Sequence, residues 1–120
     1  MNFEIIPTSY FEKSFKALAK RHRSLKNGII EFIASIQENP FQGDELSPGI
    51  RKIRMAITSK GRGKSGGTRI ITYTVVVSET DGNVFLLDIY DKLDIYDKAD
   101  FSTVDISIIK AILKELDLPE

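Results

Sequence analysis

The chain of 120 residues contains no cysteine and a single histidine, His22. The absence of cysteine excludes disulfides and thiolate chemistry and suits a reducing compartment. No apolar run approaches the roughly 20 residues that span a bilayer, and the N-terminus has no basic segment followed by an apolar one. We therefore expect a cytoplasmic protein that forms one domain over residues 1–120 and does not associate with a membrane.

The formal net charge is zero, because 17 basic residues balance 17 acidic ones. Such a balance usually argues against a nucleic-acid-binding protein, but the charges are unevenly distributed. No acidic residue occurs between Leu46 and Ser78. The same stretch holds seven basic residues, namely Arg51, Lys52, Arg54, Lys60, Arg62, Lys64 and Arg69. A local cationic surface of this kind predicts an anionic partner.

The first elements follow from short apolar patterns. Residues 3–6 form an extended segment, and Pro7 ends it because proline cannot donate to a sheet. Ser9 precedes Glu12 by three residues, the spacing of a capping box, which predicts a helix from about Tyr10 to Arg21.

A second helix follows after a short gap around His22, so the two helices are expected to form an antiparallel hairpin. Ser24 is the expected cap of this helix, and Asn39-Pro40 ends it. Residues 41–49 contain two glycines and two acidic residues and are predicted to form a loop.

Beyond this loop the apolar period changes from 3.6 to 2. One face of the predicted strand carries Ile53, Met55 and Ile57, and the other carries Lys52 and Arg54. We expect the first face in the core and the second to be basic.

Two more strands are predicted over residues 69–77 and 84–90, joined by a hairpin at Asp81-Gly82. Ser102 or Thr103 is the expected cap of a last helix. The apolar stripe of this helix consists of Ile106, Ile109, Leu113 and Leu116. The order β-α-α-β-β-β-α predicts an α+β fold, an antiparallel sheet with the helical hairpin packed on one face.

The glycine-rich segment from Gly61 to Gly67 superficially resembles a nucleotide-binding P-loop. Thr58 stands where that motif needs its first glycine, and a strand follows where a helix is needed. Glycines among cations still allow the backbone to approach phosphates closely. Because the charges extend along two strands and a loop, they fit a nucleic-acid backbone better than a small acid.

Cleavage of RNA by its own 2′-hydroxyl needs a proton acceptor, cations near the phosphorus and a proton for the departing 5′ oxygen. A pair of histidines is excluded, since His22 is alone and is expected on the surface. The five aspartates Asp88, Asp91, Asp94, Asp97 and Asp100 recur every third residue, a spacing that converges poorly on one metal ion.

A metal-free site of lysine, arginine and tyrosine remains. Tyr90 ends the third central strand, and Lys92 lies two residues further on the same side. Tyr73 alternates in phase with Ile71 and Val75, which favours a place in the core.

Three motifs, together with the element order, resemble the RelE/HigB toxins of bacterial toxin–antitoxin pairs. They are Arg51-Lys52-Ile53-Arg54, the run KGRGKSGGTRII from Lys60 to Ile71, and Ile89-Tyr90-Asp91-Lys92. The similarity covers nearly the whole chain, and the K-G-R-G-K-S-G-G-x-R run is specific to the HigB-like branch. It implies a RelE-like fold and a ribosome-dependent, metal-independent endoribonuclease that cuts mRNA without a cofactor. It also implies a cognate antitoxin, expected to be a helix-turn-helix protein, that neutralises the toxin.

Residue roles are carried over by motif from this resemblance. Lys52 and Arg54 match the basic pair of the first central strand, and Arg69 matches an arginine that stabilises the transition state. Tyr90 or Lys92 matches the last-strand catalytic group. The expected contacts to RNA phosphates are Arg51, Lys60, Arg62 and Lys64.

Alternatives remain open for the tyrosine and for the activity. The sequence LDIYDK occurs at residues 87–92 and again at 93–98, so Tyr96 could take the place of Tyr90, although continuity with the strand favours Tyr90. The family also includes ParE-like toxins that act on gyrase. A non-catalytic RNA-binding module is the third possibility.

Overall fold

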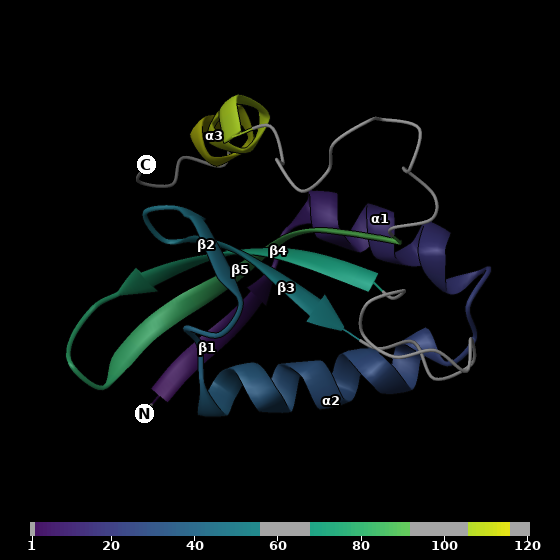
Figure 1. The fold of residues 1–120 in the computed structure, drawn as a ribbon, viewed down its shortest axis with the longest axis horizontal. Coiled ribbons are helices and arrows are strands. Elements are labelled where there is room, and N and C mark those ends of the chain that lie inside the picture. Colours follow the sequence, from purple (N-terminus) through teal and green to yellow (C-terminus); the bar gives the residue numbers. More distant parts are fainter. Residues whose placement is uncertain (1, 56–67, 92–105, 116–120) are drawn as a thin grey trace.

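Five strands and three helices form an α+β fold in a computed structural model that describes residues 2–55, 68–91 and 106–115 (Figure 1). In chain order the elements are β1 Asn2–Pro7, α1 Ser9–Ala19, α2 Leu25–Glu38, β2 Asp44–Ser47, β3 Ile50–Met55, β4 Thr68–Val76, β5 Asp81–Asp91 and α3 Ile106–Glu115. None of these three helices is long and apolar enough to cross a membrane.

The strands form one mixed sheet in the order β1-β5-β4-β3-β2. Strand β1 runs parallel to β5, and the other neighbours are antiparallel. The expectation of a purely antiparallel sheet is therefore wrong at this edge. Asn2 pairs with Asp81, and a contact between residues so far apart in sequence leaves no trace in local periodicity.

Strand β2 replaces the loop that was expected over residues 41–49. It has only four residues and pairs with β3 at the other edge of the sheet. Gly43 and Gly49 flank it with φ angles of 91° and 81°, values that favour glycine. Its sequence lacks the apolar alternation that usually identifies a strand, because none of its four residues is fully buried.

Helix α1 begins one residue earlier than expected. Thr8, not Ser9, is the cap, and its Oγ1 accepts a hydrogen bond from the backbone N–H of Phe11 at 3.2 Å. The same hydroxyl donates to the carbonyl oxygen of Leu86 in β5 at 2.8 Å. Either residue could cap the helix by type, so this tertiary bond decides the boundary. Ser24 precedes α2 as expected but makes no side-chain capping bond.

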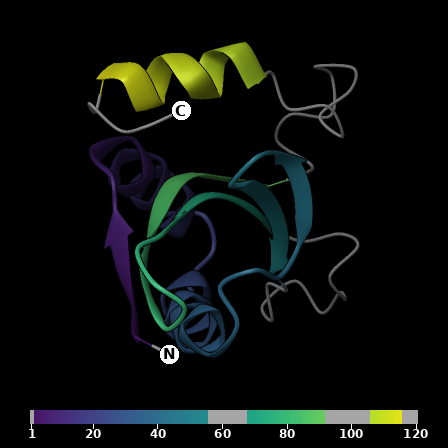
Figure 2. The same cartoon turned by 90° about the vertical axis from the view of Figure 1, so that its left-hand side faces the viewer.

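The helical hairpin packs on one face of the sheet, as expected, and α3 packs on the other. Figure 2 shows α2 and α3 on opposite sides of the curved sheet. The larger core includes Phe11, Phe32, Ile53, Ile70 and Ile89. The smaller core consists of Ile50, Ile71, Tyr73, Leu87 and, from α3, Leu113. Tyr73 is therefore a core residue, as its phase predicted.

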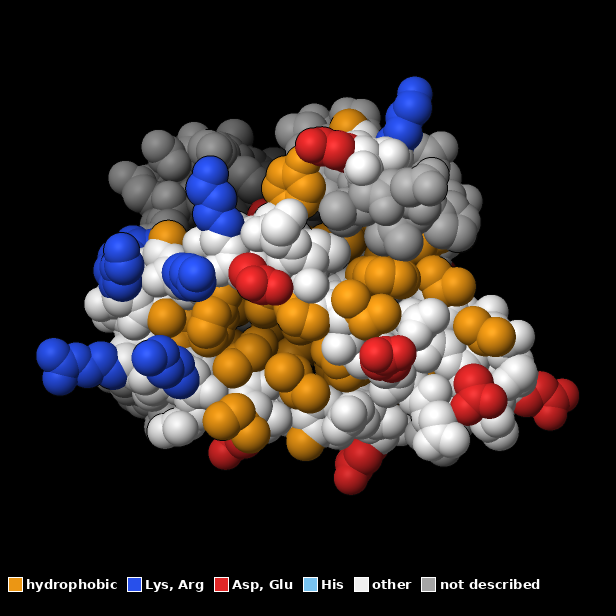
Figure 3. Space-filling view, turned by 180° about the vertical axis from the view of Figure 1, so that it is seen from behind, with side chains coloured by type: hydrophobic (Ala, Val, Ile, Leu, Met, Phe, Trp, Pro, Cys, Tyr) orange, Lys and Arg blue, Asp and Glu red, His pale blue; other side chains and the backbone are white. Residues whose placement is uncertain are grey.

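Part of the larger core remains accessible from outside. Ile5 of β1, Phe15 of α1, and Ile29 and Ile33 of α2 are only partly buried, and Ile30 is 66% exposed. In the view from behind, apolar side chains surround a hollow, with lysine and arginine side chains at its left (Figure 3). The molecule thus presents an apolar surface on its helical side.

Candidate functional site

Three of the predicted site residues form a row across three strands. Arg54 of β3 pairs in register with Arg69 of β4, which pairs with Tyr90 of β5. Directly paired residues share a face, with Cβ atoms about 4.5–5.5 Å apart. Because the alternate residues Ile53 and Ile70 point into the larger core, this row lies on the opposite, α3-bearing face.

A second row runs beside the first. Lys52 pairs with Ile71, which pairs with Asp88. An irregularity in β5 shifts the register between Ile71 and Thr72, and beyond it Asp88 shares the face of Tyr90. The structure therefore brings Lys52 together with the Arg54 row, as expected, and adds Asp88, which the sequence had suggested only as a poor metal ligand.

The two arginines of the row differ in exposure. Arg54 is exposed, whereas Arg69 is only 5% exposed. Burial lowers the pKa of Arg69, and the neighbouring positive charge of Arg54 lowers it further, while Tyr90 and Asp91 oppose the shift. Two like charges at paired positions repel each other, so an anion bound over them would be stabilised.

Tyr90 is a proton donor rather than a base at neutral pH. Burial raises its pKa to about 12, with Arg69 opposing the shift and the carboxylate of Asp88 adding to it. A phenol with such a pKa keeps its proton under physiological conditions. It can therefore donate a hydrogen bond, or a proton, to an oxygen that gains negative charge.

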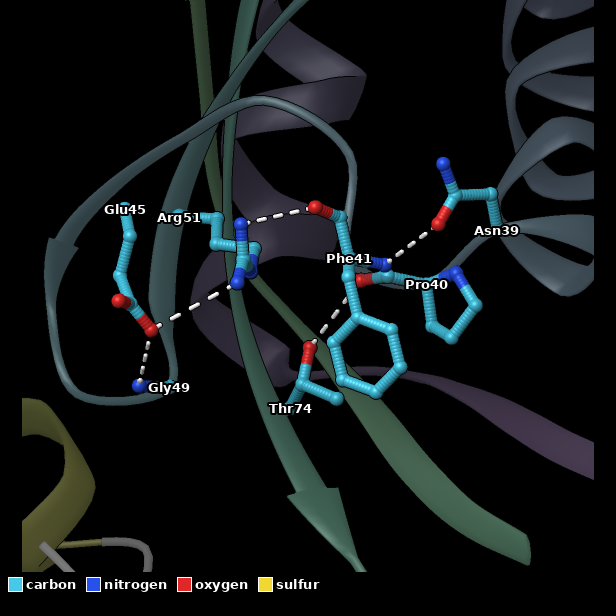
Figure 4. Close-up of polar contacts among 7 residues, drawn as sticks. All are labelled: Asn39, Pro40, Phe41, Glu45, Gly49, Arg51 and Thr74. Atoms are coloured by element: carbon cyan, nitrogen blue, oxygen red, sulfur yellow. Dashed lines mark hydrogen bonds and ion pairs between the residues drawn. The ribbon is translucent and has the colours of Figure 1, made fainter. Parts of the chain in front are cut away.

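Arg51 lies apart from this row. Its position in β3 directs it to the face of Ile53 and away from Arg54. Its Nη1 donates to the carbonyl oxygen of Phe41 at 2.8 Å, and its Nη2 lies 3.6 Å from Oε2 of Glu45 (Figure 4). The guanidinium carbon also lies 5.7 Å from the centre of the Phe41 ring. Arg51 thus holds the segment before β2 against β3, and its expected contact with an RNA phosphate stays a prediction.

The remaining predicted residues lie outside the described part of the chain. They are Ile57 of the basic strand, Lys60, Arg62 and Lys64 of the glycine-rich segment, Lys92 and Tyr96 of the LDIYDK repeat, the aspartates Asp94, Asp97 and Asp100, the expected helix caps Ser102 and Thr103, and Leu116 of the last apolar stripe.

His22 was expected as an ordinary surface residue, but it contacts a buried carboxylate. Its Nε2 lies 3.1 Å from Oδ2 of Asp91, and the two side chains are 18% and 2% exposed. This pair joins the turn between α1 and α2 to the end of β5, on the face opposite Tyr90. No local signal could have revealed it, because the partners lie 69 positions apart in the sequence.

The described residues contain no group of three or more histidine, aspartate and glutamate side chains arranged to hold a metal ion. A comparison of the chain with protein-family models finds no match.

Proposed function

We propose that this protein is a ribosome-dependent endoribonuclease of the RelE/HigB toxin type, metal-independent and neutralised by a cognate antitoxin. The observation that carries the proposal is the row in which Arg54, Arg69 and a protonated Tyr90 lie side by side on three strands. Two cations and an adjacent proton donor supply two of the needs of attack by a 2′-hydroxyl on the phosphodiester, namely positive charge near the phosphorus and a proton for the departing 5′ oxygen. The sequence motifs of the basic strands, which resemble those of RelE/HigB toxins, support the same assignment.

In this proposal the 2′-oxygen of one nucleotide attacks the neighbouring phosphorus, and the bond to the 5′ oxygen breaks. Arg54 is exposed and contacts the non-bridging oxygens of the phosphate directly. Arg69 lies in the sheet beneath and adds positive charge as negative charge grows on these oxygens. Tyr90 gives its proton to the departing 5′ oxygen.

The 2′-hydroxyl proton needs an acceptor on the same face. Asp88 lies in the neighbouring row, one position along the face from Tyr90, and a carboxylate there can accept this proton. Lys52 of the same row is 8% exposed and contributes further positive charge beside Arg54. We therefore assign Asp88 as the proton acceptor and Lys52 as a phosphate-stabilising group.

The antitoxin is proposed to cover the helical side of the molecule. The partly buried side chains of β1, α1 and α2 leave an apolar surface with a hollow (Figure 3). Exposed apolar surfaces of this kind are typical of protein interaction sites. A partner bound there does not cover the cationic row on the opposite face. Inhibition would then act indirectly or through another segment of the partner.

The proposal is tested with purified protein and a defined mRNA, incubated with and without translating ribosomes. We expect cleavage only with ribosomes. Arg69→Ala should reduce the rate on the order of 10²–10³-fold, the loss typical for one donor to a developing oxyanion. Arg23→Ala is the matched control, because Arg23 is an exposed arginine in the turn between α1 and α2.

Other outcomes would favour other functions. Growth arrest with intact transcripts and DNA-damage signalling would support a gyrase-directed toxin. Expression that cells tolerate, together with strongly salt-dependent RNA binding, would indicate a non-catalytic RNA-binding module.

A further inference from the structure

A pocket of about 350 Å³ lies beside the cationic row, at the outer edge of β3 where β2 begins. One wall is the segment Gln42, Gly43 and Asp44, and the other is Lys52, Ile53 and Arg54 of β3. Lys52 and Arg54 thus belong both to this pocket and to the candidate site. A ligand in the pocket can therefore extend directly onto the proposed phosphate position.

The first wall is held firmly in place. The side-chain Nε2 of Gln42 lies 2.9 Å from Oγ of Ser35 and 3.1 Å from the carbonyl oxygen of Asn39, where it donates hydrogen bonds. Just before it, Arg51 donates to the carbonyl of Phe41 (Figure 4). These bonds tie the wall to the end of α2 and to β3, so the pocket exists before a ligand binds.

Gly43 allows the wall to approach β3 closely. Its φ angle is 91°, and a Cβ atom there would lie 2.6 Å from both Cγ1 of Ile53 and the carbonyl oxygen of Lys52. Any side chain at this position would push the wall away from the strand. The width of the pocket therefore depends on this glycine.

The two walls differ in chemistry. Asp44 is exposed and pairs in register with Lys52, so its carboxylate lies on the same face as the cationic side chains. A ligand that fits must present hydrogen-bond donors to Asp44 and negative charge to Lys52 and Arg54. A nucleotide has both, with donors on its base and charge on its phosphate.

Guanine fits Asp44 best among the four RNA bases. Its Watson–Crick edge presents two adjacent N–H groups, which match the two oxygens of one carboxylate, whereas each other base offers a single donor position on that edge. The volume of about 350 Å³ lies at the lower end of the range for ligand pockets, which suits the base and sugar of one nucleoside.

We propose that this pocket binds a guanine nucleotide next to the scissile phosphate and so gives the enzyme a base preference through Asp44. The position of the pocket next to the cleaved phosphate rests on the proposed function, but the binding of a guanine nucleotide can be tested without cleavage.

The test measures the binding of GMP, AMP, CMP and UMP to the full chain by NMR, following the backbone amides of Gly43 and Asp44. We expect GMP to bind at least about tenfold more tightly than the other three, the value of one good two-bond contact to a base. Asp44→Asn should remove this preference, because its side chain presents one donor and one acceptor. Arg54→Ala should weaken all four nucleotides alike, since it removes a phosphate contact.

Glu31→Gln, which removes an exposed carboxylate on α2, is the matched control and should change nothing. The pocket assignment is overturned if the four nucleotides bind equally, if none shifts these amides at millimolar concentration, or if Asp44→Asn keeps the preference for GMP. A guanine preference without ribosome-dependent cleavage would reject the proposed function but keep the pocket. Ribosome-dependent cleavage without a guanine preference would reject the pocket assignment but keep the proposed function.

Discussion

Arg54 and Arg69 occupy paired positions on neighbouring strands, where like charges destabilise a sheet. We expect Arg54→Met to raise the free energy of unfolding by about 0.5–1 kcal/mol, because methionine keeps the length of the side chain and removes the repulsion. The same variant should lose most cleavage activity. Urea denaturation checks the first effect, with Arg23→Met as the control. A less stable Arg54→Met protein would show that the two charges do not repel each other in the folded state.

The raised pKa of Tyr90 predicts a loss of stability at alkaline pH. Its pKa in the folded protein is about 12, raised mainly by burial from the usual value of 10.0. Between these values the folded state binds more protons than the unfolded state, so stability falls as pH rises through this window. Below pH 10 the contribution is fully present. Urea midpoints at about pH 9 and about pH 11 should therefore drop less for Tyr90→Phe than for the native protein. Equal drops would contradict a buried, protonated tyrosine.

The proposed role of Tyr90 as a proton donor also predicts the effect of removing its hydroxyl on the cleavage rate. Tyr90→Phe should reduce the cleavage rate by about 10²–10⁴-fold, the usual contribution of a positioned proton donor. Binding of RNA should change little, because the cations remain. Tyr10→Phe removes a hydroxyl that donates to Glu115, outside the cationic row, and is the control. Full activity of Tyr90→Phe would show that another group protonates the leaving oxygen.

Residue alternation predicted part of the site correctly. It separated Lys52 and Arg54 from the core residue Ile53, and it placed Tyr73 in the core. It could not align Arg54 with Arg69 and Tyr90, because register between strands depends on turns and packing rather than on one strand's pattern. Alternation with Tyr90 also places Asp88 on this face, but the prediction missed it because it assessed Asp88 only with the other aspartates as a metal ligand.

At the scale of elements, α3 has a packing role on the face that carries the cationic row. Leu113 is fully buried against Ile50, Ile71, Tyr73 and Leu87. Leu113→Ala should reduce the free energy of unfolding by about 2–5 kcal/mol, the typical cost of a large cavity. Lys114→Ala, at an exposed position of the same helix, should cost far less. A loss below about 1 kcal/mol for Leu113→Ala would mean that α3 contributes little to the smaller core.

The helices and the central strands were predictable because their apolar periods are long and regular. The edge strands were not fully predictable. β1 was found as an extended segment, but its parallel pairing with β5 joins distant parts of the chain. β2 has four residues, and its pairing with β3 is supported by Arg51 bonding to Phe41 and Glu45 rather than by an apolar pattern.

The whole molecule separates two surfaces across one sheet. The helical side carries the apolar hollow seen in Figure 3, and the α3-bearing side carries the row of Arg54, Arg69 and Tyr90 with the pocket beside it. The net charge of zero conceals this division, because it averages over both sides. In the proposed function, a protein partner covers the apolar surface and RNA binds at the cationic row on the other side.

The most direct measurement is the mapping of transcript 5′ ends in cells that express the native chain or Arg54→Met without an antitoxin. We predict new 5′ ends within translated regions for the native chain, a steep loss of these ends for Arg54→Met, and none in untranslated RNA. Cleavage that is equally frequent in untranslated RNA, or that persists unchanged in Arg54→Met, would contradict a ribosome-dependent nuclease built on this row.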